Sequence, residues 1–249
     1  MSDEPRYSQP PLRVTVVYNN VPHARGLATA WGFAAVVETA GHTVLFDTGG
    51  DGQILMANLG RLEIDPRSVD MIVLSHMHGD HTGGLDDFLP RRPGIAVYVP
   101  RSTAREFCGA LRRRGARVER VGGAQRLVDN VHSTGEMGKD TREQALIIET
   151  SSGLVVITGC AHPGIVEMAK TARAYLGQDI HLLMGGFHLL HDSSAANRKT
   201  IGDLRKLGVH RVAPSHCTGD EATAMFRTAW GDHFVSGGCG AVIEVPRTE

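Results

Sequence analysis

The stretch SHMHGDHTGG, residues 75–84, holds three histidines and one aspartate within six positions. Neutral imidazoles and carboxylates are natural ligands of zinc, and also of iron and manganese. The alternating spacing of His76, His78 and Asp80, followed directly by His81, lets these side chains face two adjacent metal positions. The alternative is a polar loop with hydrogen-bonded imidazoles, because the chain has 13 histidines in 249 residues. The spacing favours a metal site.

The segments that precede these residues predict where they lie. The apolar run Ser68–Leu74 is typical of a buried strand and ends at the histidine cluster. Three other predicted strands end in small-residue turns with a histidine, and sites in α/β sheets gather at the carboxyl ends of strands. Four strand ends of one sheet could therefore supply one compact set of ligands. The three strands and their histidines are Leu154–Thr158 with His162, Asp179–Met184 with His188, and Arg211–Pro214 with His216.

The rest of the pattern predicts one α/β domain over residues 12–249, after a disordered, proline-rich lead-in at residues 1–11. Strands and helices alternate without a sharp change in composition. Further strands are expected at Leu12–Tyr18, Phe33–Glu38, His42–Phe46, Ile95–Val99, Gln144–Glu149 and Ala241–Val245. Helices are expected at Gln53–Leu59, Ser102–Arg114, 163–176, Ala195–Leu207 and Ala222–Trp230.

Composition limits the possible partners. The net charge of −1 gives no electrostatic reason to expect nucleic acid or an anionic membrane, and the apolar runs are far too short to span a bilayer. The N-terminus lacks the pattern of a secretory signal, and none of the four cysteines forms a CxxC pair. We therefore expect reduced thiols and a cytoplasmic location, with Cys160 packed as a small apolar residue beneath its turn.

Several motifs together resemble the metallo-β-lactamase superfamily: LFDTG, LSHMHGDHTGGL, GLVVITGCAHPGI, GGFHL and PSHCTG. The resemblance runs over about residues 12–246 and implies a four-layer αββα sandwich with metals at one edge of its two sheets. Together with STGE and QALIIET, these motifs are similar to one branch, which includes the archaeal pterin-linked synthases. GCAHPGI and PSHCTG carry most of that similarity. These synthases join a hydroxymethyl-dihydropterin diphosphate to a ribofuranosyl-aminobenzene phosphate.

The resemblance implies a role for each candidate residue. His76, His78 and His162 would hold a first metal (the first set), and Asp80, His81 and His216 would hold a second (the second set). Asp47, in the FDTG turn, would orient the ligand loop. Most hydrolases of this superfamily also have a bridging aspartate in the turn that here reads Met184-Gly185-Gly186-Phe187-His188, which offers no carboxylate.

Two divalent cations, zinc first with iron or manganese as alternatives, would activate water and polarise a carbonyl or phosphoryl oxygen. This favours a hydrolase of a small-molecule ester or phosphoester, in which Asp80 and His188 handle the proton. A pterin-diphosphate transferase and a non-catalytic metal- or ligand-binding protein are the alternatives. The polar segment Ser133–Arg142 is expected to form a mobile flap over the site. The sequence leaves the oligomeric state open.

Overall fold

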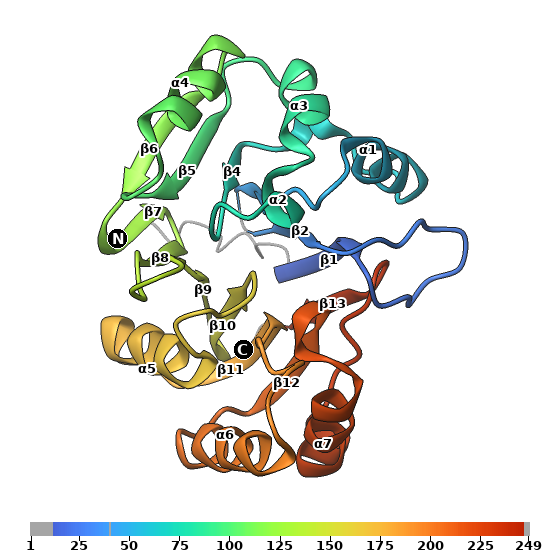
Figure 1. Ribbon diagram of the computed structural model, residues 1–249, viewed down its shortest axis with the longest axis vertical. Coiled ribbons are helices and arrows are strands. Elements are labelled where there is room, and N and C mark those ends of the chain that lie inside the picture. The colour runs from blue at the N-terminus through green and yellow to red at the C-terminus, as the bar shows by residue number, and fades with distance from the viewer. Residues whose placement is uncertain (1–11, 40, 247–249) are drawn as a thin grey trace, which may run out of the picture.

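The computed structural model describes residues 12–39 and 41–246, so the predicted lead-in lies outside the described residues. Two mixed β-sheets form the centre of the molecule (Figure 1). The seven-stranded sheet has the order β13-β1-β2-β3-β4-β5-β6. Its strands are β1 (Leu12–Asn19), β2 (Phe33–Glu38), β3 (Thr43–Phe46), β4 (Met71–Val73), β5 (Ala96–Pro100), β6 (Arg117–Val121) and β13 (Val242–Val245).

The six-stranded sheet has the order β12-β11-β10-β9-β8-β7. Strands β10, β11 and β12 run parallel to one another, whereas β7, β8, β9 and β10 pair antiparallel. The strands are β7 (Gly123–Val128), β8 (Val131–Gly135), β9 (Leu146–Thr150), β10 (Gly153–Thr158), β11 (Ile180–Gly186) and β12 (Arg211–Ser215).

Helices cover the outer face of each sheet, so the molecule has four layers in the order αββα (Figure 1). The predicted fold is confirmed. The helices on the seven-stranded sheet are α1 (Gly52–Arg61), α2 (Gly79–Thr82), α3 (Leu85–Phe88) and α4 (Arg105–Arg113). Those on the six-stranded sheet are α5 (Ile165–Leu176), α6 (Ser194–Lys206) and α7 (Asp220–Trp230). No helix in the described residues is long and apolar enough to cross a membrane.

Apolar side chains hold the layers together in three clusters. Side chains such as Val14, Phe46 and Ile157 pack between the two sheets. The other two clusters lie between each sheet and its helices, for example around Leu55 and around Met168. Full burial of one such side chain contributes about 1.5–3 kcal/mol, so these clusters make a rigid frame for the loops at the strand ends.

Strands β6, β7 and β8 were not predicted from the sequence. Strands β6 and β7 each form one edge of their sheet, most of their side chains are exposed, and their charged residues hide the strand pattern. The flap prediction for Ser133–Arg142 is wrong for Ser133–Gly135, which are buried in β8. Residues 136–142 do form an exposed or half-buried turn, whose mobility stays a prediction.

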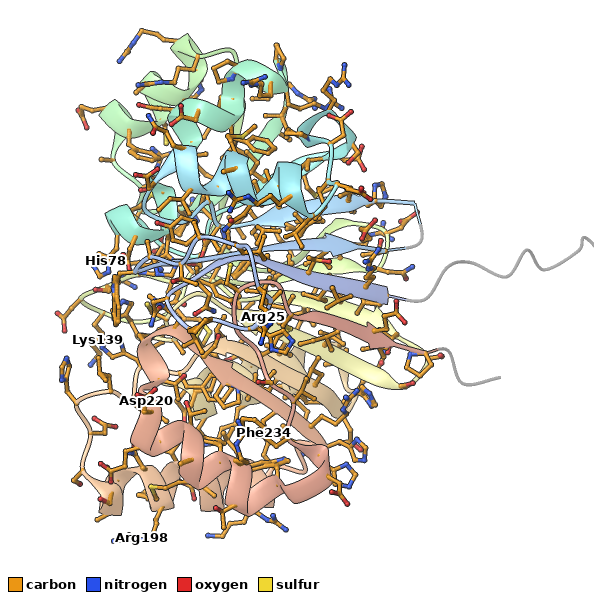
Figure 2. The ribbon with its side chains drawn as sticks, turned by 90° about the vertical axis from the view of Figure 1, so that its right-hand side faces the viewer. Arg25, His78, Lys139, Arg198, Asp220 and Phe234 are labelled. Carbon is orange, nitrogen blue, oxygen red and sulfur yellow. The ribbon has the colours of Figure 1, made fainter. Side chains whose placement is uncertain are left out.

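The strand ends that carry the candidate residues belong to both sheets. Strand β4 lies in the seven-stranded sheet, whereas β10, β11 and β12 lie in the six-stranded one, so the expectation of a single sheet is wrong. The two sheets pack face to face, and these strand ends meet at one edge of the sandwich. Figure 2 shows His78 on that side of the molecule.

Candidate metal centre

The imidazoles of the first set lie against one another. The ring centroids of His76 and His78 are 4.6 Å apart, and the His162 ring lies 4.8 Å from the first and 4.9 Å from the second. His76 and His78 come from the loop after β4, and His162 comes from the turn after β10. The structure therefore brings together the three histidines that the sequence analysis assigned to one metal.

A hydrogen-bonded chain fixes the orientation of His76. Its Nδ1 lies 2.9 Å from Ser75 Oγ, whose hydroxyl donates to Asp47 Oδ2 at 2.7 Å. Since that hydroxyl proton points to the carboxylate, Ser75 Oγ accepts from His76 Nδ1–H. The opposite ring nitrogen, His76 Nε2, carries no proton in this tautomer and faces the cluster.

The second set converges in the same way. Asp80 Oδ2 lies 3.5 Å from Nε2 of His81 and 3.5 Å from Nε2 of His216. His81 Nδ1 donates to Asp47 Oδ2 at 2.7 Å, and His216 Nδ1 donates to Asn20 Oδ1 at 2.7 Å. Both Nε2 atoms are thus directed at the same region. Asn20, in the loop after β1, is a contributor that the sequence analysis missed.

Cys160 is buried beneath its turn, as expected, and its thiol also lies among the candidate ligands. Its Sγ is 3.2 Å from His81 Nε2 and 3.4 Å from His216 Nε2. Ligand atoms of Cys160, His76 and His162 also lie within 4.8 Å of one another. A hydrogen bond with Cys217 raises the pKa of the Cys160 thiol and lowers the pKa of the Cys217 thiol.

Glu143 holds the turn that carries Cys160 and His162, and the sequence analysis did not find it. Its carboxylate accepts from the backbone N–H of Cys160 at 2.9 Å and of Ala161 and His162 at 2.8 Å. Burial raises the pKa of Glu143 to about 7, against the effect of these donors. The only signal in the sequence was a glutamate directly before an apolar strand.

Backbone strain is concentrated in the same loops. Asp47, Ala161, His188 and His216 all have positive φ, between 52° and 63°, a region that residues other than glycine rarely adopt. Such conformations cost about 1–3 kcal/mol each and persist where the surroundings enforce them, which is typical of functional sites. The strain supports a site at this edge.

The pKa values of histidines shift in opposite directions in the two sets. Burial and the neighbouring imidazoles lower the pKa of His76 far below its ordinary value and that of His162 to about 4. Burial also opposes charge on His81, but Asp47 and Asp80 overcome it and raise the pKa of His81 to about 10. At neutral pH His76 and His162 are therefore free of the extra proton, while His81 carries it.

The donor set fits divalent metal ions. Asp80, His81, Cys160 and His216 present four ligand atoms that lie within 4.8 Å of one another. His162 Nε2 is buried and has no hydrogen-bond partner among the described residues, which is costly unless something else binds it. Imidazole, carboxylate and thiolate together are typical zinc ligands.

His188 and a surface pocket complete the site. The exposed ring of His188 lies 4.2 Å from that of His162, and a hydrogen bond with Cys217 raises the pKa of His188. A pocket of about 500 Å³ adjoins His162, and Figure 2 shows its Lys139 on the same side of the molecule as His78. The pocket is lined by Met137, Gly138, Lys139, Asp140, Thr141, His162, Pro163 and Glu167.

A two-sheet αββα sandwich with candidate metal ligands at its edge is the arrangement of a large superfamily. The family model of the metallo-β-lactamase superfamily matches residues 32–216, and the chain belongs to that superfamily.

Among individual proteins, the chain is 30% identical to the 7,8-dihydropterin-6-methyl-4-(β-D-ribofuranosyl)-aminobenzene-5'-phosphate synthase of Methanocaldococcus jannaschii. That match covers 81% of this chain and 84% of the relative. It agrees with the expected similarity to the pterin-linked branch. The crystal structure of Tm1679, described as a metal-dependent hydrolase of the β-lactamase superfamily, superposes with a TM-score of 0.78. It is 26% identical, and the match covers 94% of this chain and 99% of the other. The Bacillus subtilis protein YhfI shares the fold at 16% identity, with a TM-score of 0.70 over 95% of this chain and 100% of the other.

Proposed function

We propose that this chain is a dinuclear, zinc-dependent hydrolase of a small ester or phosphoester. One observation carries the proposal: the two sets of candidate ligands lie side by side, with Cys160 Sγ close to members of both. Two divalent cations held there would activate water and polarise the oxygen of the bond to be broken. The similarity to a metal-dependent hydrolase over nearly the whole chain supports this reaction class.

The chain's own residues would handle the proton and the substrate. The imidazoles of His216 and His81 hold the pKa of Asp80 well below its ordinary value, against the effect of partial burial. Asp80 therefore suits the role of an ionised ligand that also orients water. His188 has a raised pKa and an exposed ring, so we assign it as the donor of a proton to the leaving oxygen.

The pocket beside His162 limits the substrate. Its volume of about 500 Å³ is in the range of small-molecule sites. It contains one cation, Lys139, and two carboxylates, Asp140 and Glu167, so it suits a small molecule with mixed polar groups better than a polyanion.

All four cysteines are free and buried, which supports the proposed cytoplasmic location.

A pterin-diphosphate transferase is the second candidate. Its support is the identity of 30% to the synthase from M. jannaschii over most of both chains. The same metals would then bind the leaving diphosphate, while residues around the pocket would bind the aminobenzene partner. A protein that binds metal without catalysis is the third candidate.

One paired assay separates the three candidates. Zinc-loaded protein is incubated with p-nitrophenyl esters and phosphodiesters, and in parallel with dihydropterin diphosphate plus the aminobenzene riboside phosphate. Chelator-sensitive hydrolysis of the first panel supports our proposal. Diphosphate release with the second pair, without hydrolysis of the first, would establish the transferase. Full metal occupancy without turnover in either assay would leave metal binding as the function.

A further inference from the structure

Cys160 occupies a position in the candidate metal centre that the predicted ligand sets leave unfilled. Those sets contain one anionic ligand, Asp80, although two divalent cations bring four positive charges. A second anion between the metals would offset this charge and fix their separation. The strand-end turn at Gly185 and Gly186 cannot supply it, because neither residue has a side chain.

The backbone there also leaves no room for a larger residue. A Cβ added at Gly186 would lie 2.3 Å from Gly159 O and 2.7 Å from Cys217 Sγ. The thiol of Cys217 and the backbone of Gly159 and Cys160 thus fill the space beside this strand end. The neighbouring turn after β10 places the thiol of Cys160 beside members of both sets.

The contacts of Cys160 Sγ have the spacing of ligands on one metal. In a tetrahedral zinc site, zinc–sulfur and zinc–nitrogen distances of about 2.3 and 2.0 Å place sulfur and nitrogen about 3.5 Å apart. The observed distances from Cys160 Sγ to Nε2 of His81 and of His216 are 3.2 and 3.4 Å. Asp80 Oδ2 lies 3.5 Å from the same two nitrogens.

Both Nε2 atoms are directed at the Cys160 sulfur, since both Nδ1 atoms are bonded to Asp47 and Asn20. In the metal-free chain these contacts fit a hydrogen bond from the protonated His81 to the sulfur and one from the thiol to His216. A metal ion would replace both protons and hold the same three atoms. The same sulfur also lies within 4.8 Å of the ligand atoms of His76 and His162. Its position is therefore shared between the two sets.

We propose that Cys160 is a metal ligand whose thiolate bridges the two cations. This inference rests on the dinuclear centre of the proposed function. On metal binding, the Cys160 thiol releases its proton to solvent and its sulfur forms one bond to each cation. Glu143 is the positioning residue, because its three backbone hydrogen bonds hold the Cys160 turn in place.

X-ray absorption of the zinc-loaded, wild-type protein tests the proposal without any substitution. With two zinc ions bound, a bridging thiolate gives about one sulfur neighbour per zinc at about 2.3 Å. About half a sulfur neighbour per zinc, as for a cysteine bound to one of the two metals, would overturn the bridge. Nitrogen and oxygen neighbours alone, with zinc bound, would overturn the inference and leave the dinuclear centre standing. Absence of bound zinc would overturn both this inference and the proposed function.

Cobalt-substituted variants identify the cysteine. The wild type should show sulfur-to-cobalt charge-transfer absorption in the near ultraviolet, and Cys160→Ser should lose it. Cys108→Ser is the matched control, because Cys108 is a buried cysteine in the helical layer of the other sheet and should keep the band. A band that survives in Cys160→Ser but disappears in Cys217→Ser would assign the sulfur to Cys217 and overturn the proposal.

Discussion

Asp47 Oδ2 and His81 Nδ1 lie 2.7 Å apart, and both side chains are fully buried. The same Oδ2 accepts from Ser75 Oγ, which in turn accepts from His76. One carboxylate oxygen therefore sets the ring orientation of a ligand in each set. This geometry suits the orienting role that the resemblance implied for Asp47, which stays a prediction, and we propose that it concerns both metals.

Replacement of Asp47 by Asn should weaken zinc binding by about 10- to 100-fold. Both carboxylate oxygens of Asp47 accept hydrogen bonds, Oδ1 from Ser75 N and Oδ2 from Ser75 Oγ and His81 Nδ1, and an amide group would turn an N–H toward one of these donors. Titration against a chromophoric chelator measures the zinc affinity of both proteins. Asp129→Asn, at an exposed carboxylate, is the control and should bind zinc like the wild type. Unchanged affinity in Asp47→Asn would show that this contact does not orient a ligand.

The pH dependence of zinc binding should change in the same variant. Asp47 helps to raise the pKa of His81 to about 10, so His81 carries an extra proton at pH 7 that a metal must displace. Raising the pH from 7 to 9 therefore strengthens binding to the second set, and this one proton contributes about tenfold per unit. In Asp47→Asn, the slope of the logarithm of zinc affinity against pH should fall by about one, because one proton fewer is released on binding. Equal slopes in both proteins would contradict the assignment of that proton to His81.

Glu143→Gln should loosen the turn that carries Cys160 and His162. Because Gln has one acceptor oxygen, at least one of the buried backbone N–H groups loses its partner, at a cost of about 1–3 kcal/mol. Chemical denaturation measures the free energy of unfolding, and zinc titration measures the zinc affinity of the site. Glu106→Gln, on the exposed face of α4, is the control and should change neither. Wild-type stability and zinc affinity in Glu143→Gln would rule out the positioning role.

Gly159→Ala should destabilise the protein by about 1–3 kcal/mol and lower its zinc content, because the site has no room for a methyl group. Its Cβ would lie 2.1 Å from Ser75 Oγ and 2.9 Å from Asp47 Oδ2. Gly202→Ala is the matched control, since Gly202 lies in α6 with nothing within 4 Å of an added Cβ. It should be stabilised by about 1 kcal/mol. Thermal unfolding measures the stability of both variants. Equal unfolding temperatures for Gly159→Ala and Gly202→Ala would contradict this packing.

The sequence was a good guide to the parts of the molecule with a clear hydrophobic period. The apolar strands β1, β4 and β10 and the long helices α5 to α7 lie within a few residues of their predicted bounds. Strands β6 and β7 could not be found in this way, because they bury few side chains and show no hydrophobic alternation. The site residues at strand ends were found because each histidine follows an apolar run.

The residues that the sequence could not reveal depend on tertiary contacts. Cys160 has the burial of an ordinary core cysteine, and only the fold brings its sulfur to residues 56 and 79 positions away. Glu143 lies in a polar segment that resembles a surface loop, yet it is fully buried. Asn20 contacts His216 across 196 positions, a pairing that no local pattern indicates.

Metal stoichiometry tests the central claim most directly. Elemental analysis of zinc-loaded, desalted protein should give about two zinc ions per wild-type chain and about one per chain of His78→Ala, since the first set would lose a ligand. Wild-type protein that retains no zinc, or a His78→Ala variant that keeps the full wild-type content, would contradict the account.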